Sequence, residues 1–389
     1  MRNVETSRSV LFISPGPDLS SPSSGEGARL KHLSYELSRT WNVYALVPAG
    51  TTTTLPWIDT VFTYDQWSLP FLTDLNPAFI RNLRQALSET DPDIVHTSKG
   101  VWMSALLSRL VSSSTKVVYA AQNVEADHAR DFASDDLPIH KKLLGPRLIP
   151  FLERLSVRCA DHVTTVSEKD ADTFRDRYGL ESDFITSIPT GTHLVEGSEL
   201  DSTDAVREQF GVDNVPIAVF HGTGTHPPNR EAAELICHEV APALEERDVD
   251  VSFLIAGKGM PDCNHPMTKT IGFVDDLDSL LHASDIAVVP IRHGGGTKTK
   301  IYDYLSHGLP MVSTQKGVEG IDVEAGTHAI VSEDVDETFV KGVVRLATDA
   351  EARGEMSASV KRFASEREWS TSAKQLGEAY SSLLAPVHS

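Results

Sequence analysis

The residues of this sequence that are best suited to chemistry lie in one glycine-rich segment. The segment contains Gly294, Gly295, Gly296, Thr297, Lys298 and Lys300, and it follows a predicted strand at 286–290. Glycines at the start of a helix let backbone N–H groups approach an anion, and the helix N-terminus contributes about half a positive charge. Asp303, one turn further on, could accept hydrogen bonds from sugar hydroxyls. The pattern predicts a pyrophosphate site beside a ribose site; the alternative is a solvated turn with an ion pair between Lys300 and Asp303.

Other glycine-rich or polar loops also follow predicted strands. Gly222, Thr223 and Gly224 follow a strand at 217–220, where the two glycines could admit a phosphate or the reacting sugar close to the backbone. In the first half of the chain, the residues suited to contact a ligand such as a sugar hydroxyl are Gly25, Glu26, Gly27, Arg29, His96, Asn123 and Glu125. Ligands of open α/β sheets bind beyond the carboxyl ends of the strands, where these residues are expected to lie. For each loop taken alone, an ordinary strand–helix connection or a capped helix start is the alternative.

Short apolar strands alternate with amphipathic helices in two series along the chain. This alternation predicts parallel sheets that are covered on both faces. A polar stretch at 189–203 separates the two series, and 50–71 is predicted to be irregular. The sequence therefore predicts an α/β protein with two Rossmann-like domains. The predicted parts are residues 1–195, residues 196–365, and a helix at 366–389 that returns to the first domain.

Composition and charge exclude several classes of protein. The chain has 389 residues, with 35 Lys and Arg against 55 Asp and Glu, and its net charge of −20 makes nucleic acid an unexpected partner. Its 15 histidines form no HExxH motif. The acidic pair Asp276 and Asp278 stands where a helix should begin, and acidic residues there complement the helix dipole. No metal site is predicted.

The cysteines and the apolar runs bear on the compartment. Cys159, Cys237 and Cys263 are widely spaced, which predicts no disulfide and a reducing compartment. No apolar run approaches the roughly 18 residues of a membrane span and no secretion signal is recognised, so a cytoplasmic protein is expected. The basic segment 139–158 predicts either a helix at a domain edge or peripheral contact with the inner face of a membrane.

Taken in order, these segments resemble the GT-B glycosyltransferases of the family 4 (group 1) type. The most specific resemblance lies in 272–276, 283–290, 294–303, 305–314 and 317–320, and a weaker one in 122–125, 160–168 and 188–191. It implies a retaining hexosyltransferase without a metal or another cofactor. It also implies a UDP- or GDP-linked sugar held mainly by the second domain. The acceptor, a glycan, a lipid-linked sugar or a small molecule, would lie on the first domain.

The resemblance also implies roles for single residues. The donor-binding residues would be Gly222, Thr223, Gly294, Gly295, Gly296, Thr297, Lys298, Lys300 and Asp303. The catalytic residues would be Lys298, Lys300 and Gln122, of which the two lysines match the basic pair that neutralises the leaving pyrophosphate. Three positions differ from the common pattern, since Asp303 replaces a ribose-binding Glu, Lys298 replaces Arg, and Gln122 replaces a His near the reacting sugar. These differences leave a second function open, namely a catalytically weak relative that binds a sugar nucleotide or glycan as an assembly partner.

Overall fold

The computed structural model describes residues 8–15, 25–50, 55–66, 72–129, 139–195, 201–212, 214–294 and 297–385. The chain forms two compact units. Unit 1 consists of Met1–Gly191 and Trp369–Ser389, and unit 2 consists of Thr192–Glu368. The chain enters unit 2 after residue 191 rather than 195, and it leaves unit 2 after residue 368 rather than 365.

Unit 1 is built on a seven-stranded, wholly parallel sheet of order β3-β2-β1-β4-β5-β6-β7. The strands are β1 (Ser9–Ile13), β2 (Asn42–Pro48), β3 (Thr60–Tyr64), β4 (Ile94–Ser98), β5 (Lys116–Ala120), β6 (His162–Thr165) and β7 (Ile185–Ser187). The helices are α1 (Gly25–Leu37), α2 (Pro77–Thr90), α3 (Ser104–Val111), α4 (Glu125–His128), α5 (Ile139–Cys159), α6 (Glu168–Tyr178) and α14 (Trp369–Leu384).

Helices cover both faces of this sheet, because the side chains of each strand alternate between the two faces and both sets are apolar. On β1, Val10 and Phe12 belong to the apolar cluster that includes residues of α1 and α14, whereas Leu11 and Ile13 belong to the cluster that includes residues of α2. The parallel sheet is thereby enclosed by helices, as the continuous apolar character of its strands predicts.

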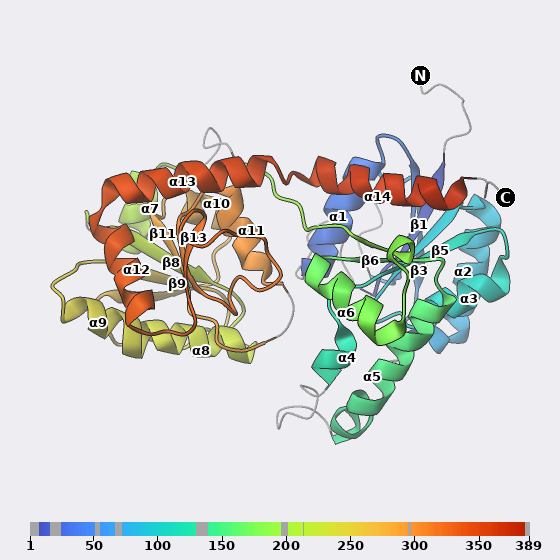
Figure 1. Ribbon diagram of the computed structural model, residues 1–389, viewed down its shortest axis with the longest axis horizontal. Coiled ribbons are helices and arrows are strands. Elements are labelled where there is room, and N and C mark those ends of the chain that lie inside the picture. The colour runs from blue at the N-terminus through green and yellow to red at the C-terminus, as the bar shows by residue number, and fades with distance from the viewer. Residues whose placement is uncertain are drawn as a thin grey trace. The chain divides into compact units, whose positions relative to one another are not determined.

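Helix α14 is part of unit 1 although it follows unit 2 in the sequence. It lies beside α1 (Figure 1). Trp369, Leu376 and Tyr380 recur at helical spacing and are each at most 5% exposed. They join the core that contains Leu33 and Leu37 of α1. Unit 1 therefore draws its core from two separate stretches of chain.

Unit 2 has a six-stranded parallel sheet of order β10-β9-β8-β11-β12-β13. The strands are β8 (Ile217–His221), β9 (Ser252–Ala256), β10 (Thr268–Gly272), β11 (Ile286–Val289), β12 (Met311–Thr314) and β13 (Ala329–Ser332). The helices are α7 (Thr203–Phe210), α8 (Pro227–Leu235), α9 (Ala241–Glu245), α10 (Leu277–His282), α11 (Thr299–Ser306), α12 (Glu337–Thr348) and α13 (Ala350–Ser365), with a π-helical turn at Ile236–Val240 between α8 and α9.

The prediction that 50–71 is irregular is wrong for β3. This strand forms the edge of the sheet beside β2. Its sequence Thr-Val-Phe-Thr-Tyr is rich in β-branched and aromatic residues, and Phe62 and Tyr64 turn inwards on alternate positions. The alternating pattern spans only five residues and is flanked by turn residues, so it is a weak sequence signal for a strand.

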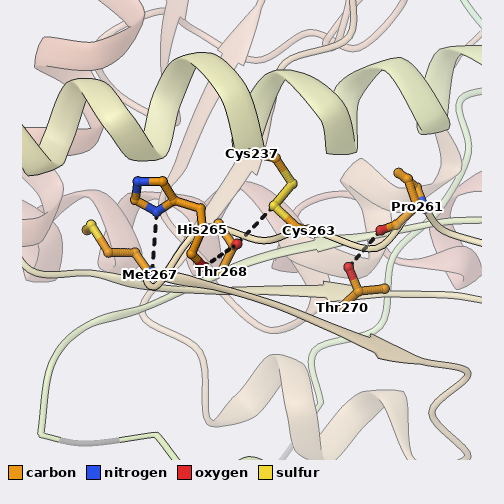
Figure 2. Close-up of a disulfide and its surroundings, with 7 residues drawn as sticks. All are labelled: Cys237, Pro261, Cys263, His265, Met267, Thr268 and Thr270. Atoms are coloured by element: carbon orange, nitrogen blue, oxygen red, sulfur yellow. Dashed lines mark hydrogen bonds between the residues drawn. A yellow bond between two sulfur atoms is a disulfide. The ribbon is translucent and has the colours of Figure 1, made fainter.

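The prediction that the cysteines form no disulfide is also wrong. Cys237, in the π-helical turn, is bonded to Cys263, in the loop before β10, with a Cα–Cα distance of 5.8 Å (Figure 2). The hydroxyl of Thr268 on β10 donates a hydrogen bond to Sγ of Cys263. Helix and loop meet because β9 and β10 are neighbours in the sheet, and sequence spacing alone does not reveal this proximity.

Candidate functional site

Each sheet reverses its strand order beside its first strand. In unit 1, β1 lies between β2 and β4, and in unit 2, β8 lies between β9 and β11. The connections on the two sides of such a point leave in opposite directions, which opens a crevice outside the carboxyl ends of the strands. The predicted donor residues follow β8 and β11, whereas Glu26 follows β1 and Gln122 follows β5.

The loops after β8 and β9 pack backbone against backbone. A Cβ on Gly257 would lie 1.7 Å from the carbonyl oxygen of Gly222, and one on Gly224 would lie 2.0 Å from that of Gly259. Only glycine fits this packing. A Cβ on Gly222 itself would lie 3.1 Å from Nζ of Lys300. The glycines are therefore needed to pair the two loops. The Cβ side of Gly222 is closed by the Asn229 side chain, whose Nδ2 would lie 2.7 Å from a Cβ, and the Lys300 ammonium group lies next to it.

Lys300 is a buried cation with neutral partners. Its side chain extends from the first turn of α11, its Nζ donates a 2.6 Å hydrogen bond to Oδ1 of Asn229, and it lies 4.1 Å from the centroid of the Phe220 ring. Among the described residues, no carboxylate oxygen lies within 4.0 Å of this Nζ. Burial, followed by the charge of Lys298, lowers the pKa of Lys300 to about 7. The site therefore contains an ammonium group that an anion would stabilise.

The segment before α11 adds further polar groups to the same place. Nζ of Lys298 donates a hydrogen bond of 3.2 Å to the carbonyl oxygen of Gly294. Oγ1 of Thr297 is buried and lacks a hydrogen-bond partner within the part of the chain that the structure describes. Thr223 is exposed on the loop after β8, and its carbonyl oxygen accepts a hydrogen bond from Asn229. The predicted residues Gly295 and Gly296 lie outside the described residues.

Asp303, on the same helix, lies beside a neutral histidine. Its Oδ2 is 3.4 Å from Nε2 of His221, the last residue of β8. Burial, reinforced by the charge of Lys300, lowers the pKa of His221 to about 3, so this imidazole carries no charge at neutral pH. Burial also raises the pKa of Asp303 to about 6. The carboxylate is thus not locked in an ion pair with His221, and it can accept hydrogen bonds from a ligand.

In unit 1, the structure brings together Glu26, Asn123 and Glu125 around a lysine that was not predicted. Nζ of Lys99, which follows β4, lies 2.9 Å from Oε1 of Glu125, and Nδ2 of Asn123 donates to the same oxygen at 3.1 Å. Oε1 of Glu26 is buried and, in the described chain, has no hydrogen-bond partner. Burial raises the pKa of Glu26 to about 7, against the lowering influence of Lys99.

The other predicted acceptor-side residues occupy different surroundings. Gly25 and Gly27 lie in the first turn of α1. Arg29 is buried, and its Nη2 donates to the carbonyl oxygen of Ile188 at 2.5 Å. His96 is enclosed in the core, where its Nδ1 lies 2.6 Å from the Tyr380 hydroxyl. The structure therefore does not bring Arg29 or His96 to the carboxyl group of Glu26.

Three residues of these sites were missed at the sequence level. Lys99 directly follows β4, and a careful reading of strand ends could have found it. Asn229 lies inside α8, and Glu153, whose carboxylate accepts the backbone N–H groups of Glu125 and Ala126, lies inside α5. Nothing in the sequence sets either one apart from surface polar residues. The acidic pair forms a helix start as expected, since Oδ1 of Asp276 accepts the backbone N–H of Ser279 at 2.9 Å. No group of three His, Cys, Asp or Glu suited to a metal ion occurs in the described residues.

Comparisons with known proteins fit this geometry. Residues 215–349 match the family model for "Glycosyl transferases group 1", and residues 25–196 match that for "Glycosyltransferase Family 4". YtcC of Bacillus subtilis (strain 168) is 21% identical over 281 residues, which cover 64% of this chain and 67% of that protein.

Solved structures share the fold over almost the whole chain. Alr3699/HepE of Anabaena, in complex with UDP and glucose, is 15% identical with a TM-score of 0.67 and matches 96% of this chain and 100% of its own. Sucrose-phosphate synthase of Thermosynechococcus elongatus is 15% identical with a TM-score of 0.72 and matches 97% of this chain and 99% of its own. The chain belongs to the GT-B glycosyltransferases of the family 4 (group 1) type.

Proposed function

We propose that the protein is a retaining hexosyltransferase that moves a sugar from a UDP- or GDP-linked donor to a hydroxyl group of a glycan, lipid-linked or small-molecule acceptor, without a bound metal. The observation that carries the donor side is Lys300, a buried ammonium group whose hydrogen-bond partner and ring contact among the described residues, Asn229 and Phe220, are neutral. An unpaired buried charge is costly, so an anionic ligand is expected there. Retention rests on the family resemblance.

The proposed chemistry needs positive charge where the leaving group forms. The bond between the anomeric carbon and the diphosphate oxygen breaks, and the diphosphate keeps the electron pair. The acceptor oxygen bonds to the same carbon and gives up its proton to the diphosphate or to solvent. Lys298, Lys300 and the first N–H groups of α11 would stabilise the developing charge, which is the task that a metal ion performs elsewhere.

A thermal-shift panel tests the donor assignment. UDP, GDP, ADP, TDP and their sugar conjugates are added in the presence of EDTA. UDP is tried first, because the HepE structure holds UDP. A nucleotide sugar at a hundred times its Kd should stabilise the protein by about 2.7 kcal/mol, which corresponds to several degrees. A shift that EDTA removes would contradict metal independence, and no shift with any nucleotide would contradict the donor site.

The product then decides between transfer and mere binding. Proton NMR of the anomeric signal, recorded during turnover, should show the configuration of the donor sugar in the product. An inverted product would contradict retention. Tight nucleotide binding without transfer or donor hydrolysis over hours would instead favour an assembly role for a catalytically weak protein.

We also propose that α5 places the protein on an anionic membrane surface. Its exposed face presents a stripe with a spacing of three and four residues, formed by Leu144, Arg147, Phe151, Arg154 and Arg158. Leu144 and Phe151 are 52% and 61% exposed. Glu153 is the only acidic residue of α5, and it is buried. An apolar and basic stripe on a chain of net charge −20 is suited to anionic lipid. No described helix is long and apolar enough to cross a membrane.

Vesicle cosedimentation tests this surface. The protein should bind vesicles of phosphatidylcholine and phosphatidylglycerol at low salt and leave neutral phosphatidylcholine vesicles unbound. Arginines near an anionic surface contribute about 1 kcal/mol each, so replacing Arg147, Arg154 and Arg158 by Gln should lower binding at least tenfold. A control with Arg81→Gln and Arg84→Gln on α2, which are also exposed, should bind as the wild type does. Equal losses in both variants would contradict a specific role for α5.

A further inference from the structure

A carboxylate from a distant helix holds the start of α4. Val124, which precedes the helix, provides no side-chain cap. Instead, the backbone N–H groups of Glu125 and Ala126 donate to Oε1 and Oε2 of Glu153 at 2.8 and 3.2 Å. Glu153 lies on α5 and is 0% exposed. Its carboxylate therefore provides the acceptors that the first helical N–H groups require.

Glu153 is itself held in place from a third helix. The hydroxyl of Tyr178, on α6, donates to its Oε2 at 2.5 Å. Burial raises the pKa of Glu153 to about 7, while these three hydrogen bonds favour its charged form. A buried carboxylate with three donors is fixed in position, and so is the backbone that it binds.

Fixing this backbone decides where the side chain of Glu125 lies. Glu125 is 8% exposed, and its Oε1 binds Nζ of Lys99 at 2.9 Å. Asn123 donates to the same oxygen. The charge of Lys99 lowers the pKa of Glu26, yet Nζ of Lys99 donates its hydrogen bond to Glu125. Glu125 thus keeps Lys99 from pairing with Glu26.

The result is an open carboxyl oxygen after β1. Oε1 of Glu26 is buried without a hydrogen-bond partner among the described residues. A buried acceptor of this kind is costly unless a ligand satisfies it. Hydroxyl groups are the donors that a glycosyl acceptor offers in greatest number.

We propose that Glu153 is a positioning residue of the acceptor side: by holding Glu125 on Lys99, it leaves Oε1 of Glu26 open to a hydroxyl group of the acceptor. This inference rests on the proposed function, together with an acceptor bound on unit 1, as the family resemblance implies. It assigns to unit 1 a neutral polyol or sugar as the ligand at this point, because the negative charge of Glu125 also acts on the Glu26 carboxyl group.

The test follows the Glu26 carboxyl group directly. Glutamate labelled with ¹³C at Cδ gives a titratable carboxyl signal, which the Glu26→Gln variant assigns. In Glu153→Gln, the backbone of Glu125 should no longer be fixed, so the ion pair between Glu125 and Lys99 should weaken and Lys99 should pair with Glu26 instead. An opposite charge in contact lowers a carboxyl pKa by about one unit or more, so the midpoint should fall by that amount. Glu125→Gln should give the same fall, and the double variant should give no further one, because both act through Lys99.

Two further variants separate positioning from mere stability. Glu153→Asp keeps the negative charge on a side chain that is too short to reach the backbone of α4, so the titration midpoint of Glu26 should fall in this variant too. This variant provides the test if Glu153→Gln does not fold. Tyr178→Phe leaves both backbone bonds in place and should keep the midpoint within a few tenths of a unit. A Glu153 variant that lowers Tm but leaves the Glu26 midpoint unchanged would overturn the proposal.

Glycerol, as a hydroxyl probe, tests access to the open oxygen. It should move the Glu26 carboxyl signal in the wild type but not in Glu153→Gln, where Lys99 would occupy that oxygen. Absence of movement in the wild type would overturn the assignment of a hydroxyl ligand. The nucleotide thermal shift, recorded on the same samples, reports on unit 2. A failure of the proposed transferase function would therefore appear separately from a failure of this inference.

Discussion

Replacing Lys300 by alanine is expected to lower kcat/KM for the sugar nucleotide by a hundredfold or more. Stabilisation of developing charge by a fixed donor is typically worth about 3–4 kcal/mol, and Lys300 is the buried cation beside Gly222 and Asn229. Steady-state kinetics with the nucleotide found in the thermal-shift panel provides the measurement. Activity equal to that of the wild type would remove Lys300 from the site.

The low pKa of Lys300 also predicts how the affinity for the sugar nucleotide depends on pH. In the free protein this pKa is about 7, and a bound pyrophosphate would raise it, so binding takes up a proton above pH 7. Affinity for the sugar nucleotide should therefore be greatest below pH 7 and fall roughly tenfold per unit above it. The charged or titratable groups that face Lys300 are Lys298, Asp303, His221 and His226. A sugar nucleotide serves better than a free diphosphate, whose terminal phosphate titrates in the same range.

Lys300→Arg provides the matched control. Arginine stays charged throughout this range, so the fall in affinity between pH 7 and 9 should disappear even if the arginine binds less tightly. Asn229→Leu removes the neutral partner of Lys300 and should weaken binding without restoring charge at high pH. A pH dependence that persists in Lys300→Arg would assign the titrating group elsewhere.

Reduction of the disulfide is expected to destabilise unit 2 by about 3.5 kcal/mol. The bond joins residues 26 apart in the sequence, and the chain-entropy relation for a loop of that length gives this value. For a unit of this size, Tm should fall by roughly 7–14 °C. Calorimetry with and without dithiothreitol would measure it.

A double replacement, Cys237→Ser with Cys263→Ser, separates the bond from the reductant. It should reproduce the effect of dithiothreitol and then show no further response to it. The control is Cys159→Ser in unit 1, where the free cysteine lies, and this variant should keep its sensitivity to dithiothreitol. A Tm that dithiothreitol leaves unchanged in the wild type would contradict a stabilising role for the bond.

The fold could be predicted from the sequence to the extent that each element carries its own signal. The apolar runs of β1 and β8 and the helical spacing of Leu30, Leu33 and Leu37 are local patterns, and they suffice for the parallel α/β architecture. The strand β3 has only five residues with alternating burial, and the disulfide depends on two segments that meet across β9 and β10. Those features arise from tertiary neighbours, which spacing does not encode.

The same distinction applies to the candidate site. Gly222, Lys298, Lys300 and Asp303 follow strand ends in sequence order, so a reading of loops finds them. The surroundings of Lys300, on α11, are set by Asn229 on α8 and Phe220 on β8. Sequence patterns therefore locate the loops of the site, whereas the charge state of its residues depends on the packing of elements far apart in the chain.

The division of unit 1 between two stretches of chain has a consequence for synthesis on the ribosome. Residues 192–368 must be made before α14, whose Trp369, Leu376 and Tyr380 belong to the core of unit 1. At 5–20 residues per second, this leaves the apolar face of α1 uncovered for roughly 10–40 s. During that interval the nascent unit exposes Leu33, Leu37 and their neighbours, a surface of the kind that chaperones bind. Unit 2, made from one continuous stretch, can complete its own core while unit 1 still waits for its last helix.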